Sequence, residues 1–168
     1  MARRHARGMG AVQIGVVGPG DGASGDDLAT AHRLGLLLGR AGATVVCGGL
    51  GGVMAAACAG ARGAGGLTVG LLPGADPGAG NGHLSVVLPT GIGEMRNVLI
   101  LRAVRAVIGV GGSFGTLSEL AHANRMGRPV ALIRPPEVRF AGDDAPTPLG
   151  FVAADADEAV AWALAAAG

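Results

Sequence analysis

Lysine is absent from this chain of 168 residues, and every one of its 13 basic side chains other than histidine is an arginine. The phosphate-binding loop of P-loop NTPases needs a lysine that reaches the phosphates of the nucleotide. Pyridoxal phosphate enzymes need a lysine that forms the internal Schiff base with the cofactor. The sequence therefore excludes both enzyme classes before any motif is considered.

Aromatic residues and cysteines are also scarce. The aromatic residues are Phe114, Phe140, Phe151 and Trp162. With so few rings, the core is expected to consist of Val, Leu, Ile and Ala. The two cysteines, Cys47 and Cys58, lack a C-x-x-C spacing, so we expect small buried core residues rather than a disulfide.

Strong net charge and long apolar runs are missing as well. The formal net charge of +1 gives no electrostatic argument for a nucleic-acid partner. No run approaches the ~18 consecutive apolar residues of a membrane helix, so we expect no membrane contact and a cytoplasmic location. His32, His83 and His122 show no metal-ligand spacing, and we expect them to be packed or solvated, with no metal site.

Apolar runs alternate with helix-like segments along most of the chain, whereas residues 1–10 form a basic stretch that we expect to be a flexible tail. Residues 11–168 are expected to form a single nucleotide-binding domain. Strands are expected at 12–17, 44–47, 68–72, 85–88, 106–110 and 129–133, and helices at 26–40, 53–62, 94–103, 116–125 and 155–166. This order predicts an α/β Rossmann-like fold, a doubly wound parallel sheet of about six or seven strands with helices on both faces.

Glycine-rich loops follow three of the expected strands, beginning at Gly18, Gly48 and Gly111. The carboxyl ends of parallel strands share one edge of the sheet, so the three loops should meet there. The loop that starts at Gly111 leads into a helix, and a glycine loop at a helix N-terminus is suited to binding a phosphate. Gly18 and Gly20 belong to a G-x-G-x-x-A pattern. Dinucleotide binding is disfavoured, because Cys47-Gly48-Gly49 stands where an acid should hold the ribose.

Two charged residues are candidates for chemistry near these loops. Glu119 follows Thr116 in a T-x-x-E pattern, which fits either a helix capping box or a carboxylate that belongs to the site. Placed in the first helical turn, this carboxylate should stay ionised at pH 7. Arg96 follows another glycine loop and is either a solvated helix residue or part of the same site.

The combined motifs resemble those of the LOG-like proteins, phosphoribohydrolases that were formerly labelled lysine decarboxylases. Gly111-Gly112, Gly115-Thr116 and Glu119 stand where that family has its P-G-G, G-T and E residues, with Val110 in place of the proline. Residues 47–55 resemble the family's second glycine element, and Arg96 matches its arginine motif, with Asn97 in place of lysine. The resemblance covers about residues 12–133. The differences at Val110 and Asn97 make the chain more similar to a sister branch of bacterial proteins, which in turn resembles the molybdenum-cofactor carrier protein of algae.

The resemblance implies a homodimer that hydrolyses the N-glycosidic bond of a nucleoside 5′-monophosphate, giving free base and ribose 5-phosphate. The alternative is a non-catalytic protein that binds or carries a nucleotide or the molybdenum cofactor, a pterin. The hydrolase function requires no cofactor. The absence of lysine independently excludes the former decarboxylase label. Arg96 and Glu119 are the expected catalytic residues. The expected nucleotide- and phosphate-binding residues are Gly18, Gly20, Gly48, Gly49, Gly51, Gly52, Met54, Gly111, Gly112, Ser113, Gly115 and Thr116.

Overall fold

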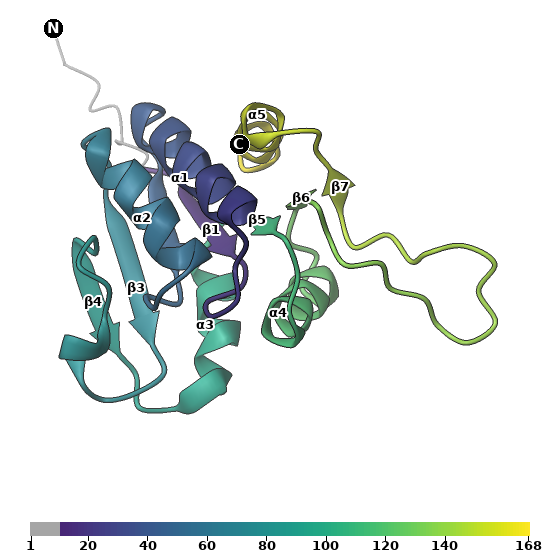
Figure 1. The fold of residues 1–168 in the computed structure, drawn as a ribbon, viewed down its shortest axis with the longest axis horizontal. Helices are drawn as coiled ribbons and strands as arrows, with labels where there is room; N and C mark the ends of the chain where they lie inside the picture. Colours follow the sequence, from purple (N-terminus) through teal and green to yellow (C-terminus); the bar gives the residue numbers. More distant parts are fainter. Residues whose placement is uncertain (1–10) are drawn as a thin grey trace, which may run out of the picture.

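Residues 11–168, described by a computed structural model, fold around one seven-stranded sheet with helices on both faces (Figure 1). The expected tail at residues 1–10 lies outside the described residues. All neighbouring strands are parallel, in the order β4-β3-β2-β1-β5-β6-β7. The strands are β1 (Gln13–Val17), β2 (Thr44–Cys47), β3 (Thr68–Leu72), β4 (Val86–Pro89), β5 (Ala106–Val110), β6 (Val130–Ile133) and β7 (Phe151–Val152). The predicted Rossmann-like doubly wound fold is confirmed.

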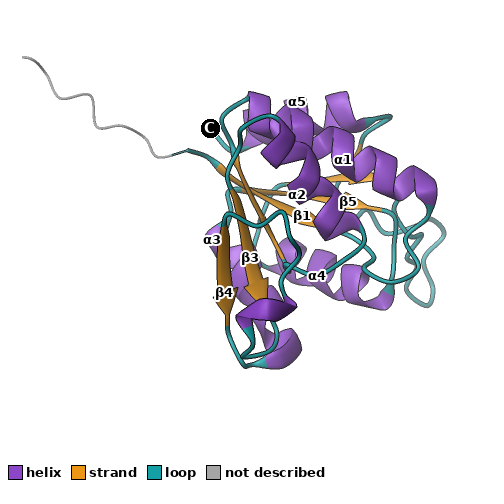
Figure 2. Cartoon of the chain, turned by 60° about the vertical axis from the view of Figure 1, so that its left-hand side comes forward, coloured by secondary structure: helices purple, strands orange, loops and turns teal. Residues whose placement is uncertain are grey.

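The helices form one layer on each side of the sheet, as Figure 2 shows. They are α1 (Gly25–Arg40), α2 (Val53–Gly63), α3 (Arg96–Ala103), α4 (Phe114–Arg125) and α5 (Ala156–Ala166). Helices α1, α2 and α5 share one buried apolar cluster with the sheet, and α3 and α4 share the other. Strand β5 is buried along its whole length, and its alternate side chains feed the two clusters. The core consists of Val, Leu, Ile and Ala, as the scarcity of aromatic residues predicts, together with the two cysteines, Cys47 and Cys58.

Helices α1 and α2 pack backbone against backbone through two glycines. A Cβ atom added at Gly35 would collide with the carbonyl of Ala57, and one added at Gly60 would collide with the carbonyl of His32. Glycine inside a helix costs about 1 kcal/mol relative to alanine, and here close packing of the two helices offsets that cost. This contact fixes the first two glycine loops relative to each other, because each loop leads directly into one of these helices.

Most expected elements end within one residue of their observed bounds, and the exceptions have local causes. Helix α4 begins at Phe114 rather than Thr116. The segment expected as a helix at 94–103 opens with a short 3-10 turn, η2 (Gly93–Met95), before α3 begins. A second 3-10 turn, η1 (Pro77–Ala79), lies in the loop after β3. Strand β7 was not located from the sequence because its two residues are too few to show a hydrophobic period.

Candidate functional site

A pocket of about 230 Å³ opens at the carboxyl edge of the sheet, where loops that follow β1, β2 and β5 meet the start of α3. It brings together both expected catalytic residues and most of the expected binding residues. Its lining is Gly18, Gly20, Asp21, Leu50, Gly51, Met54, Glu94, Arg96, Asn97, Ser113, Gly115, Thr116 and Glu119. The prediction that the glycine loops converge at one edge is therefore confirmed.

The first turn of α4 forms one wall of this pocket. Ser113 is the N-cap, and its Oγ accepts a hydrogen bond from the backbone N–H of Thr116 at 3.1 Å. The hydroxyls of the two residues are also 2.9 Å apart. The N-terminal N–H groups of a helix and its positive dipole end attract anions. This wall can therefore hold a phosphate between a helix end and two hydroxyl groups.

Glu119 lies in the second turn of α4, so it does not form the capping box with Thr116 that the sequence allowed. The helix begins earlier because Ser113 caps it. The Glu119 side chain is buried, at 9% exposure, and burial raises its pKa to about 7. The positive charge of Arg96 opposes this shift, and the negative charge of Glu94 adds to it. The expectation of a fully ionised carboxylate at pH 7 is therefore wrong, because loss of hydration outweighs the nearby positive charge.

Arg96 begins α3 and is 4% exposed, so the alternative of a solvated helix arginine is wrong. Its guanidinium donates to the side-chain oxygen of Asn97, whose amide donates to Glu94 at 3.3 Å. The Nε atom of Arg96 has no hydrogen-bond partner within residues 11–168. A buried donor without a partner carries a desolvation cost, which a bound acceptor such as a phosphate or carbonyl oxygen would relieve.

Five of the expected binding glycines do not line the pocket, and close packing explains most of them. A Cβ atom at Gly48 would lie 2.7 Å from both Nη atoms of Arg96. One at Gly52, where φ is +59°, would collide with the carbonyls of Pro19 and Gly20. These two glycines let the loop after β2 lie against Arg96 and against the loop after β1.

The remaining three glycines support the site from outside. A Cβ atom at Gly49 would lie 2.6 Å from Leu72, and one at Gly112 would lie 2.9 Å from Pro136. Gly111 has a φ of +61° and faces Asp27 of α1. A left-handed backbone conformation favours glycine, so Gly111 shapes the turn from β5 towards α4.

Sequence reasoning missed four lining residues: Asp21, Leu50, Glu94 and Asn97. Each lies in a glycine loop that the sequence singled out, or directly beside Arg96, so position along the chain was a usable signal. Asp21, Glu94 and Glu119 give the pocket three carboxyl groups, and Arg96 gives it one guanidinium. Such a lining suits a ligand that presents hydroxyl or N–H donors in addition to a phosphate.

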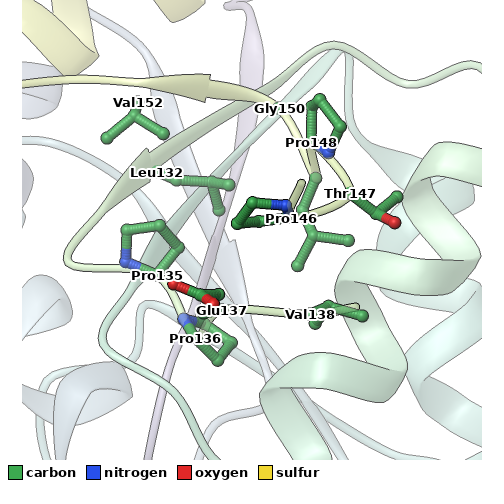
Figure 3. Close-up of a pocket in the computed structure, with 11 residues that line it drawn as sticks. Leu132, Pro135, Pro136, Glu137, Val138, Pro146, Thr147, Pro148, Gly150 and Val152 are labelled. Carbon is green, nitrogen blue, oxygen red and sulfur yellow. The ribbon is translucent and has the colours of Figure 1, made fainter. Parts of the chain in front are cut away.

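A second pocket, of about 280 Å³, lies between β6, β7 and residues 135–150 (Figure 3). Proline and aliphatic side chains dominate its lining, and its acidic residue, Glu137, pairs with Arg139 at 2.7 Å. It lacks the convergent polar groups that a nucleotide site requires.

The two cysteines are buried and the three histidines outside residues 1–10 are exposed, which agrees with the predictions of core thiols and of packed or solvated histidines. Cys47 and Cys58 are buried free thiols with their sulfur atoms 3.6 Å apart. His32, His83 and His122 are exposed to solvent. Among residues 11–168, no three His, Cys, Asp or Glu side chains gather to form a metal site. In the same range, no helix has the length and apolar character needed to cross a bilayer.

Comparison with known proteins identifies relatives across nearly the whole chain. The model of the SLOG cluster4 family matches residues 11–160. An uncharacterized protein of Archaeoglobus fulgidus is 40% identical over 130 residues, covering 77% of this chain and 85% of that protein. A molybdenum cofactor binding protein of Rippkaea orientalis has a TM-score of 0.81 at 30% identity, covering 91% of this chain and 95% of that one. The molybdenum cofactor carrier protein of Chlamydomonas reinhardtii has a TM-score of 0.80 at 30% identity, covering 93% and 98%.

Proposed function

Because the chain belongs to the SLOG cluster4 family, we propose that the glycine-loop pocket binds a phosphorylated nucleotide or a nucleotide-like ligand. The observation that carries this proposal is that the first turn of α4 lines the same pocket as the buried side chains of Arg96 and Glu119. The phosphate lies against Ser113, Gly115 and Thr116, where helix N–H groups and hydroxyls meet it. The rest of the ligand lies against the loops that follow β1 and β2.

The first candidate ligand is the molybdenum cofactor, and the role is binding or carriage without chemistry. This candidate is supported by two solved relatives at 30% identity, one described as a binding protein and the other as a carrier protein of that cofactor. A pterin with a phosphate group offers both features that the pocket can recognise. Its phosphate suits the start of α4, and its N–H groups suit the carboxyl groups of Asp21 and Glu94.

The second candidate function is hydrolysis of a nucleoside 5′-monophosphate to free base and ribose 5-phosphate. The observation that favours it is Glu119, whose pKa of about 7 suits a group that accepts a proton near neutral pH. In this mechanism Glu119 in its ionised form orients the attacking water and takes a proton from it as the water oxygen bonds to C1′ of the ribose. The C1′–N bond breaks, the base leaves with the electron pair, and the proton passes to the base, which returns Glu119 to its ionised form. Arg96 stabilises the negative charge that develops on the departing base or on the phosphate.

One experiment separates the two candidates. Purified protein is incubated with AMP, CMP, GMP, UMP and an N6-modified AMP, and free base is measured by chromatography. In parallel, protein mixed with the molybdenum cofactor is passed through a desalting column, and retained molybdenum is measured. The matched control is Glu119→Gln, which keeps the shape of the side chain and removes its titration.

Each outcome decides a point. Base release that disappears in Glu119→Gln supports the hydrolase. Retained molybdenum without base release supports the carrier. Failure to bind any phosphate ligand overturns the proposal as a whole.

We also propose that the protein is a cytoplasmic homodimer that pairs through the face of α3 and α4. Large apolar side chains are exposed on this face: Met95 at 71%, Leu99 at 43% and Phe114 at 94%. Phe114 lies between Ser113 and Gly115, two lining residues of the pocket, so a partner that contacts Phe114 would lie close to the pocket. Contiguous exposed apolar side chains are typical of protein interfaces.

A further inference from the structure

Six arginines lie at one edge of the sheet, in links that carry no acidic residue. In the parallel sheet, the link from the end of a helix to the next strand lies at the amino edge, opposite the glycine loops. Four such links, residues 40–43, 62–67, 102–105 and 125–129, contain no Asp or Glu. They contain Arg40, Arg62, Arg102, Arg105, Arg125 and Arg128. The net charge of +1 conceals this local excess of positive charge, because it sums over the whole chain.

A cavity of about 520 Å³ lies at this edge, between the C-terminal ends of α3 and α4. It is lined by Arg102, His122, Arg125, Met126 and Arg128. Within the part of the chain that the structure describes, no carboxyl group contributes to the lining. We refer to these five residues as the arginine cavity.

Arg128 ties the two helix ends together. Its Nε donates to the carbonyl of Leu101 at 3.0 Å, and its Nη2 donates to the carbonyl of Arg102 at 3.2 Å. These bonds hold its guanidinium in a fixed orientation against the last turn of α3. The cavity is therefore built around one restrained cation, which reduces the entropy lost when a ligand binds.

The other two guanidiniums are free to bind a ligand. Within residues 11–168, the ion pairs involve only the arginines Arg33, Arg134 and Arg139. Arg102 and Arg125 are exposed and belong to none of these pairs. Like charges gathered around one cavity repel one another, and a bound anion removes that repulsion.

The helix dipole explains why a single arginine lies at the end of a helix, but it does not explain why three arginines lie around one cavity. Arg40 and Arg62 each lie in the last turn of a helix, where a positive charge offsets the helix dipole. Neither of them lines the arginine cavity. Three arginines meet around a hollow at the ends of α3 and α4, and arginine binds phosphate and carboxylate groups through paired N–H donors.

We propose that the arginine cavity binds a small anion with two or more negative charges, of phosphate or carboxylate chemistry. This second site is separate from the glycine-loop pocket. Helices α3 and α4 each begin at that pocket and end at the cavity, and α4, with 12 residues, spans about 18 Å.

The test is calorimetric titration of the full chain with inorganic pyrophosphate and, separately, with citrate at low ionic strength. All proteins carry Ser113→Asp, which places a negative charge in the glycine-loop pocket and should repel phosphate there, so that the remaining binding reports on the arginine cavity. The test variant adds Arg102→Ser and Arg125→Ser, both at exposed positions. The matched control adds Arg40→Ser and Arg62→Ser, which removes two exposed arginines from the ends of α1 and α2 and leaves the cavity intact. Circular dichroism verifies that every variant is folded.

Loss of two charge-assisted contacts should weaken binding of at least one anion about tenfold or more, while the control that lacks Arg40 and Arg62 binds within about twofold of the parent protein. Equal weakening in the control would overturn the proposal, since it would mean that general surface charge attracts the anion. The proposal would also be overturned if neither anion bound at concentrations up to about 1 mM. A short single-stranded oligonucleotide that binds far more tightly, and is lost in the same variant, would also overturn it by assigning the surface to nucleic acid.

Discussion

Glu119 and Arg96 are buried side chains that line the same pocket. Loss of hydration, rather than attraction to Arg96, decides the charge of Glu119. The guanidinium of Arg96 lowers the pKa of this carboxyl group, but loss of hydration raises it further, to about 7. At neutral pH the pair therefore exists in two protonation states of similar free energy. A ligand that brings or removes a charge would select one of these states.

This pKa makes the stability of the protein depend on pH in a defined direction. The ordinary pKa of the group is 4.5, so between that value and about 7 the unfolded chain has released a proton that the folded protein retains. The free energy of unfolding therefore falls as pH rises through this window, by at most about 3 kcal/mol. Glu119→Gln removes the effect. Its stability relative to the wild type, from urea unfolding, should be greater near about pH 8 than near about pH 5. An equal difference at both pH values would contradict the raised pKa.

Ser113 offers a test of phosphate binding that leaves the helix cap in place. Aspartate is as good an N-cap as serine, so Ser113→Asp should keep the thermal stability within about 1 kcal/mol of the wild type. Its negative charge would repel a phosphate at the start of α4, and binding of a phosphorylated ligand should be lost. Ser113→Ala is the converse control, because it weakens the cap by about 1 kcal/mol without adding charge. Calorimetric titration and thermal unfolding measure the two effects separately. Undiminished ligand binding by Ser113→Asp would place the phosphate elsewhere.

Two glycines of the same loop should respond differently to alanine. At Gly48 the added methyl group meets the flexible ends of Arg96 and Met54, which can move, so the fold should survive while Arg96 is displaced. At Gly52 the added methyl group meets two backbone carbonyls, which cannot move aside as side chains can. Gly52 also has a positive φ, which residues with a Cβ atom rarely adopt. Gly52→Ala should therefore lower the free energy of unfolding by more than about 1 kcal/mol.

Ligand affinity and thermal unfolding of both variants check this contrast. Gly48→Ala should weaken ligand binding with only a small change in stability. If Gly48→Ala binds ligand as well as the wild type, Arg96 does not contact the ligand.

The proposed dimer predicts that a charge on the exposed face of α3 produces a monomer. Leu99→Asp places a carboxylate among exposed apolar side chains and should abolish association, because a buried charge without a partner is costly. Leu67→Asp is the matched control, since Leu67 is 56% exposed and lies in the link before β3, outside α3 and α4. Sedimentation velocity distinguishes the two variants. A wild-type protein that sediments as a monomer at micromolar concentration would refute the dimer.

The sequence by itself determined the fold class and the edge of the sheet that carries the pocket. Alternating apolar runs and helical patterns are local properties, and each glycine loop is a local interruption that follows a strand. Parallel strands must place those loops together, so the meeting of Gly18, Gly51 and Gly115 in one pocket could be predicted. The importance of Arg96 was also visible, as an arginine beside one of these loops.

Only the tertiary structure decided the electrostatics. The pKa of Glu119 depends on how much water is excluded by residues far away in the chain, and no local pattern reports this. Two further features likewise depend on which loops and helix ends lie side by side. One is that Asp21 and Glu94 line the pocket, and the other is that Arg102, Arg125 and Arg128 line one cavity. Hydration and charge interactions act through space rather than along the chain, so they are fixed only when the elements pack.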